Sequence, residues 1–222
     1  MNKPNDAKLL SKIIIEGDLI NTSPFIIGTG GGNTIDLEII KDDKGNPYIP
    51  ATSFVGALRH YILNNFSIID KKIWDYFWGS KKITEKDSLQ VQSHFIVNDI
   101  KLKTKEDMEQ NGIIGIRDGI SIDKRKGIVK KGDGAKYDYE IVNKNLEFFL
   151  RAEVTIRKSI CANEPLQSRL MILRILKTII NELEKQNVYF GAFTTKGFGR
   201  FKLNECNVYL YEFPEKGRDY LE

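Results

Sequence analysis

The segment from Leu146 to Ile156 restricts the fold of this chain more than any other, because apolar and polar residues alternate along it. A two-residue period is typical of a β-strand that buries one face and exposes the other. Pro165 then begins a stretch in which apolar residues recur every three or four positions, and proline is favoured in the first turn of a helix. A one-sided strand followed by a one-sided helix predicts an α+β domain, with helices on one face of a sheet. The predicted apolar stripe of this helix consists of Leu166, Leu170, Leu173, Leu176, Ile180 and Leu183.

Other segments complete an order of strands and helices. Residues 9–20 predict a buried first strand, and residues 53–66 predict a helix for which Ser53 is the expected N-cap. Residues 73–79 then predict a buried aromatic turn, and residues 89–102 contain a further strand. Three short strands are expected near the C-terminus, at Val188–Phe190, Arg200–Leu203 and Val208–Phe213.

This order of elements predicts a ferredoxin-like (RRM-like) βαββαβ core, with a β-hairpin inserted before the third core strand. We expect a single domain over residues 1–222, because a chain of this length can bury a core of its own. The helices would cover one face of the sheet and leave the other face free for RNA, as in other RNA-binding sheets of this plan.

The inserted hairpin, at about residues 116–142, concentrates positive charge. Between its strand-like arms, residues 124–136 carry six lysine and arginine residues against one acid, Asp133. The net charge of the whole chain is only +4, so a nucleic-acid surface must come from such local clustering. Charge runs are usually solvated loops, but the length, charge and central glycines of this one favour contact with nucleic acid.

A glycine-rich loop begins at Gly28 and leads to a single carboxylate, Asp36, between two apolar residues. The loop matches neither the dinucleotide-binding pattern nor the P-loop pattern, since its glycine spacing differs and no G-K-[ST] follows. Asp36 is therefore either a solvent-facing strand residue or an acid that binds metal or handles a proton near a scissile phosphate.

A second glycine-rich segment, residues 191–203, reads GAFTTKGFGRFKL. It offers backbone N–H groups, two hydroxyls and the cations Lys196 and Arg200, and its phenylalanines can pack or stack on bases. Alone, the segment is consistent with an ordinary glycine-containing turn. Its occurrence together with the basic hairpin is a more specific sign of RNA binding.

Histidines, cysteines and apolar runs add neither a catalytic nor an export signal. His60 and His94 are the only histidines and have no neighbour at metal-ligand spacing, so a structural role is expected for each. The two cysteines form no CxxC pair, which argues against a disulfide framework and a cysteine zinc site. With no secretory apolar core and no apolar run of roughly 18 residues, the expected location is the cytoplasm.

Three motifs together resemble the RAMP superfamily of CRISPR proteins, and most closely the backbone ribonuclease subunit of type III (Csm/Cmr) effector complexes. The first motif, TIDLEIIKDDKGNPYIPATSFVGALR, is similar to the family's aspartate-bearing loop and the helix start that follows it. The second, GISIDKRKG with YDYEIV, is similar to the family's thumb hairpin, and the third, GAFTTKGFGRFKL, to its C-terminal glycine-rich loop. The resemblance covers most of the chain, with the motifs in the family's order.

The resemblance implies a guide-RNA-binding backbone subunit that also cuts target RNA as a divalent-metal-dependent endoribonuclease, with Mg²⁺ or Mn²⁺ as the cation. Asp36 falls where the family's catalytic, metal-binding aspartate falls, beside a nucleotide that the thumb flips. The ribose 2′-hydroxyl would attack in line, with Asp36 and the ion orienting it. The implied partners are the guide (CRISPR) RNA, single-stranded target RNA, other copies of the chain in a helical filament and other subunits of the complex, with no membrane. The residues expected to bind RNA are Ser53, Arg59, Lys124, Arg125, Lys126, Thr195, Lys196 and Arg200.

Departures from the family's pattern leave two other functions open. Val55 stands where the family commonly has lysine, which removes a phosphate contact, and residues 51–53 read Ala-Thr-Ser in place of Gly-Ser-Ser. One alternative is a structural RAMP subunit that does not cut. The other is a guide-processing endoribonuclease of the same superfamily, which would need His60 or a tyrosine–lysine pair as acid and base.

Overall fold

The computed structural model describes residues 8–30, 37–67, 70–80, 92–103, 110–120, 128, 136–158 and 165–213. Its centre is an antiparallel sheet of six strands with the order β10-β1-β9-β6-β4, in which β5 also pairs with β9. β1 (Leu9–Asn21) pairs with β9 (Glu147–Arg157) on one side and with β10 (Phe201–Glu212) on the other. The short strands β5 (Phe95–Val97), β6 (Ile100–Leu102) and β4 (Tyr48–Ile49) continue the sheet past β9.

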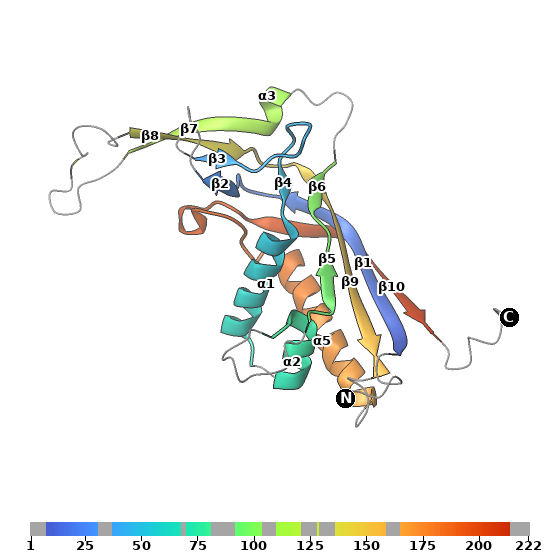
Figure 1. Ribbon diagram of the computed structural model, residues 1–222. Coiled ribbons are helices and arrows are strands. Elements are labelled where there is room, and N and C mark those ends of the chain that lie inside the picture. The colour runs from blue at the N-terminus through green and yellow to red at the C-terminus, as the bar shows by residue number, and fades with distance from the viewer. Residues whose placement is uncertain are drawn as a thin grey trace.

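Three helices cover one face of this sheet, as Figure 1 shows: α1 (Ala51–Asn65), α2 (Lys71–Trp78) and α5 (Pro165–Glu184). A four-residue helix, α3 (Gln110–Ile113), precedes the inserted hairpin. Burial alternates along β9 as predicted, and the chain therefore has the expected α+β class with antiparallel sheets. In the part of the chain that the structure describes, no helix is both long and apolar enough to cross a membrane.

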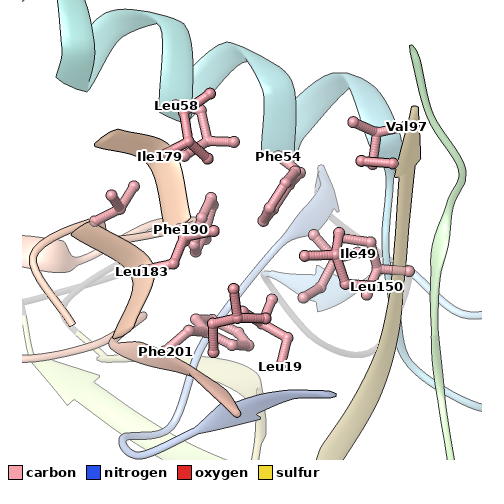
Figure 2. Packing of buried hydrophobic residues seen from close by; sticks show 14 of the residues in the cluster. Leu19, Ile49, Phe54, Leu58, Val97, Leu150, Ile179, Leu183, Phe190 and Phe201 are labelled. Carbon is pink, nitrogen blue, oxygen red and sulfur yellow. The ribbon is translucent and has the colours of Figure 1, made fainter. Parts of the chain in front are cut away.

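Aromatic rings join the helices to the sheet. Phe54 of α1 stacks on Phe190 with ring centroids 4.8 Å apart, and Phe190 meets Phe201 of β10 edge-on at 5.4 Å. Figure 2 shows these rings in one cluster with aliphatic side chains of α5, among them Leu183. Each buried phenylalanine contributes about 1.5–3 kcal/mol relative to an exposed one. The cluster therefore fixes the first turn of α1 beside the chain that enters the second glycine-rich segment.

A hydrogen bond ties the outer parts of α1 and α5 together. The Tyr61 hydroxyl donates to Glu182 Oε2 at 2.6 Å. Burial, reinforced by this carboxylate, raises the pKa of Tyr61 to about 12. The same bond lowers the pKa of Glu182, because the hydroxyl stabilises the charged carboxylate.

The inserted hairpin consists of β7 (Ile114–Ile120) and β8 (Lys136–Val142), which pair antiparallel and confirm the predicted arms. We call these two strands the thumb hairpin. A smaller sheet of β2 (Gly28–Gly30) and β3 (Glu38–Ile39) lies beside it at one end of the main sheet (Figure 1). Between the arms, only Ile128 is among the described residues, so the predicted RNA contacts Lys124, Arg125 and Lys126 lie outside them.

Two predictions at helix starts are wrong. Residues 71–78 form a helix rather than a turn, because the Asp70 carboxylate accepts hydrogen bonds from two N–H groups of the first turn and caps it. Ser53 is the third residue of α1 and not its N-cap, a position that Pro50 takes. The carboxylate of Asp99 serves the helix start instead, accepting the Ala51 N–H at 2.8 Å.

The strands near the C-terminus also differ from the prediction. Arg200–Leu203 and Val208–Phe213 belong mostly to one long strand, β10, which continues through a register shift opposite Gly17 because Glu205 adopts a positive φ of 49°. Val188–Phe190 forms only an isolated bridge, between Tyr189 and Arg200. The strand predicted within residues 89–102 is divided into β5 and β6.

The predicted apolar stripe of α5 is partly wrong. Leu170 and Leu173 are 47% and 44% exposed. This helix carries two overlapping apolar stripes, and the core covers the one that the prediction did not identify. Its buried members are Ile172, Leu176, Ile179 and Leu183.

Candidate functional site

The second glycine-rich segment forms a loop that packs backbone against backbone on residues 24–27. Gly191 and Gly199 have positive φ values of 90° and 78°. A Cβ on Gly191 would lie 2.1 Å from the Ile26 carbonyl oxygen, and one on Gly199 would lie 2.1 Å from that of Phe190. The Ala192 N–H donates to the Ile26 carbonyl at 2.8 Å across the same contact. Only glycine fits such close approaches, so the loop can pack this closely on residues 24–27 only with glycine at both positions.

The loop contacts the thumb hairpin through aromatic rings. Tyr139 of β8 meets Phe193 at 5.5 Å and Phe198 at 6.5 Å between ring centroids. Two cations lie over these rings: Lys196 Nζ is 4.3 Å from the centre of Phe193, and the Arg117 guanidinium of β7 is 5.4 Å from that of Phe198. Cation–π contacts of this kind place positive charge beside flat apolar surface.

Tyr137 extends this surface along the thumb hairpin. Its ring stacks near Tyr139 at 5.9 Å and lies across Gly119, where a Cβ would come within 2.3 Å of the ring. In the register of the hairpin, Gly119 faces Tyr137 and Arg117 faces Tyr139, so these four residues share one face. We call this group the aromatic–basic cluster; it consists of Arg117, Tyr137, Tyr139, Phe193, Lys196 and Phe198. Phe198 is buried beneath it, whereas the two cations are exposed.

The cations predicted in the loop are exposed and close to aromatic rings. Arg200 donates to the Tyr189 hydroxyl at 2.6 Å and lies 5.3 Å over that ring. Thr195 is exposed in the 3₁₀ turn Thr194–Lys196. Among the described residues, no carboxylate forms a salt bridge with Arg117, Lys196 or Arg200. Their charge is therefore available to an anionic partner.

Ser53 and Arg59 both lie on α1. Ser53 is half-buried in the first turn of α1, next to Phe54, whose ring stacks on Phe190 at the entrance to the loop. Arg59 follows six residues later, which on an α-helix is roughly 9 Å along the axis and about 120° around it.

Asp36 lies outside the described residues, which resume at Leu37. Leu37 forms a parallel bridge with Tyr139 of the thumb hairpin, and its carbonyl accepts the Glu140 N–H at 3.0 Å. Glu140 is only 8% exposed. Its carboxylate accepts the Ile39 N–H at 3.1 Å and the Lys41 ammonium at 2.8 Å.

Sequence reasoning missed Arg117, Tyr137, Tyr139 and Glu140. The tyrosines and Glu140 stand in YDYEIV, where alternation does signal two faces. Alternation does not tell what each face contacts. Glu140, for example, bonds to residues about a hundred positions away in the sequence, and no local pattern reveals such a pairing.

The histidines have the surroundings of structural residues. His94 stacks on Tyr76 at 3.8 Å, and its Nδ1 lies 3.0 Å from the Thr155 hydroxyl oxygen. Burial, with a smaller effect of Arg157, lowers the pKa of His94 and keeps the ring neutral near neutral pH. His60 is exposed on α1, where its ring contacts Asn64 of the same helix. Within the described part of the chain, no group of three or more histidine, cysteine, aspartate or glutamate side chains could hold a metal ion.

Comparison with known proteins identifies the family of this chain. A search of curated proteins finds no match. The family model of the RAMP superfamily matches residues 19–202, a span that includes the first glycine-rich loop, α1, the thumb hairpin, α5 and all but the last residue of the second glycine-rich segment. Because this match takes in most of the chain, the protein belongs to the RAMP superfamily, and membership implies a CRISPR-associated RNA-binding protein.

Proposed function

We propose that this protein is the guide-RNA-binding backbone subunit of a type III CRISPR interference complex and that it cuts target RNA as an endoribonuclease. The observation that carries the proposal is the aromatic–basic cluster, where exposed Lys196 and Arg117 lie over aromatic rings beside the described end of the Asp36 segment. Unpaired cations attract phosphates, and aromatic faces accept bases that are not paired. The partners are guide RNA, single-stranded target RNA, further copies of the chain in a helical filament and other subunits of the complex.

The sheet order supports a ferredoxin-like core for this subunit. β1, the β5–β6 pair, β9 and β10 are the four core strands, and the first and third of them are neighbours at the centre. α1 lies between the first and second core strands in the chain, and α5 lies between the third and fourth. This arrangement supports the βαββαβ order, in which the thumb hairpin would be the insertion before β9.

Cleavage in this proposal depends on Asp36, whose carboxylate would orient the ribose 2′-hydroxyl for in-line attack on the adjacent phosphate. The bond from phosphorus to the 5′-oxygen of the next nucleotide would break, leaving a 2′,3′-cyclic phosphate and a 5′-hydroxyl, and the proton lost by the 2′-hydroxyl balances the one that the leaving oxygen takes up. Orientation of this kind lowers the barrier because the reacting groups are already held in place. Oxygen ligands suit Mg²⁺ or Mn²⁺, and a divalent cation would add stabilisation of charge on the phosphate. Asp36 is the one residue that we propose for holding it, together with oxygens of the RNA.

The test is a complex reconstituted with guide RNA and labelled target RNA. We expect regularly spaced cuts with the unmodified chain, loss of the cuts with Asp36→Ala or on chelation of divalent cations, and unchanged binding of both RNAs. Asp43→Ala is the matched control, because Asp43 is an exposed acid a few residues further along the chain. Cuts that persist in Asp36→Ala would remove this residue from the mechanism. An absence of any cuts in the unmodified complex would favour the non-cleaving structural subunit.

A further inference from the structure

Glu140 is a buried carboxylate that RNA binding does not explain. Burying a charged group is unfavourable unless hydrogen bonds and an opposite charge compensate it. Glu140 has both: Oε2 accepts the Ile39 N–H at 3.1 Å, and Oε1 accepts the Lys41 ammonium at 2.8 Å. Its own N–H donates to the Leu37 carbonyl at 3.0 Å. One residue of the thumb hairpin therefore holds three alternate residues of the segment that follows Asp36.

The opposite side of this segment is held by backbone contacts. Ile39 pairs with Gly28, and the Ile40 N–H donates to the Ile27 carbonyl at 2.8 Å. A Cβ on Gly28 would lie 2.9 Å from the Leu37 side chain, so the two strands are in close contact. Residues 37–41 thus lie between the first glycine-rich loop and the thumb hairpin, and Glu140 supplies the contact with the thumb hairpin.

β8 connects this segment to the aromatic–basic cluster. Consecutive residues of a strand point to opposite faces. Accordingly, Tyr139 packs on Phe193 of the loop, whereas Glu140 contacts Ile39 and Lys41. A displacement of β8 therefore moves both contacts together.

We propose that Glu140 is a positioning residue that couples the seating of the thumb hairpin on RNA to the position of residues 37–41, which directly follow Asp36 in the chain. The coupling rests on the proposed function, since its consequence for cleavage requires Asp36 to act on the target. Glu140 itself does not touch RNA. Without its carboxylate, the Leu37 carbonyl would still accept the Glu140 N–H, but Ile39 and Lys41 would lose their bonds to the thumb hairpin. Residues 37–41 would then follow the thumb hairpin less closely.

The experiment compares Glu140→Ala and Glu140→Gln with Lys41→Met in the reconstituted complex. Glu140→Gln retains an acceptor for the Ile39 N–H, whereas Lys41→Met removes only the ion pair. We expect amide hydrogen exchange at Ile39 to increase strongly in Glu140→Ala and little in the other two variants. The single-turnover cleavage rate should fall about 10- to 100-fold in Glu140→Ala, since small displacements of reacting groups have effects of that order. Target affinity should stay within about threefold, and Glu140→Gln should restore most of the rate.

The two proposals fail in different ways. Unchanged exchange at Ile39 in Glu140→Ala overturns the coupling, as does a cleavage rate per assembled complex equal to that of the unmodified chain. A parallel loss of target affinity and rate, unrelieved by Glu140→Gln, would show that Glu140 only maintains the fold and likewise overturns it. If Asp36→Ala cuts at the unmodified rate, the proposed catalytic role fails, while the exchange measurement still decides whether Glu140 holds the segment.

Discussion

A single glycine, Gly191, allows the second glycine-rich loop to lie directly against Ile26. Its φ of 90° is unfavourable for a residue with a Cβ, and a Cβ there would lie 2.1 Å from the Ile26 carbonyl oxygen. No side chain therefore fits at this position unless the backbone moves. Gly197 has a similar φ of 86°, but a Cβ there would meet no atom within 4 Å. Substitution of Gly197 therefore measures the free-energy cost of the positive φ alone, whereas substitution of Gly191 adds the cost of the clash with Ile26.

We expect Gly197→Ala to lower the free energy of unfolding by about 1 kcal/mol, the usual cost of a left-handed conformation for a residue with a Cβ. Gly191→Ala carries the same strain and a backbone clash, so its loss should exceed that of Gly197→Ala by at least about 1 kcal/mol. Chemical denaturation measures both losses of free energy, provided that the slope of the free energy of unfolding against denaturant concentration is the same in the variants and the unmodified chain. Equal losses for the two variants would show that the loop moves away from Ile26 without cost.

The thumb hairpin shows, at the scale of an element, how one strand can be anchored and still present a surface. Tyr139 packs against the loop through Phe193, whereas Tyr137 lies across Gly119 within the hairpin. We expect Tyr139→Ala to raise amide exchange in both arms and in residues 193–198. Tyr137→Ala, the matched control, should raise it only within the hairpin, because among the described residues its ring packs on Tyr139 and Gly119 of the same hairpin. Exchange confined to the hairpin in both variants would contradict the anchoring role of Tyr139.

Elements with a clear period were predictable from the sequence, whereas contacts between distant segments were not. The alternation of β9 and the start of α5 at Pro165 follow from local patterns and are confirmed. α2 was predicted as a turn because its buried aromatic residues mask the helical period, although Asp70 before it is a usable capping signal. Residues 191–203 could be recognised as a glycine-rich loop, but its contact with Tyr139 depends on the fold as a whole.

The cations on the two parts of the surface differ in whether a carboxylate already pairs with them. On the sheet face that the helices leave uncovered, Lys12 forms a salt bridge with Glu153 at 2.7 Å, and Arg151 and Lys103 are paired with Glu16 and Asp18. Cations that are already paired with carboxylates neutralise few phosphates, so few counterions leave the RNA when it binds there. The described cations of the aromatic–basic cluster have no such partner, which favours RNA contact at the thumb end over the open sheet face.

This difference predicts where salt dependence originates. For single-stranded nucleic acid, each neutralised phosphate contributes roughly −0.7 to the slope of log affinity against log salt concentration. Replacing both Arg117 and Lys196 with alanine should therefore make the slope for target RNA less steep by about 1 to 1.5 and weaken binding most at low salt. Replacing both Lys12 and Lys103 removes the same formal charge from the open sheet face and should leave the slope nearly unchanged, because those ammonium groups are already neutralised by Glu153 and Asp18.

The measurement is a salt titration of RNA affinity for the two double variants and the unmodified chain. An equal reduction in slope for both pairs would place the RNA across the whole surface, whereas a larger reduction for Lys12 and Lys103 would move the interface to the open sheet face.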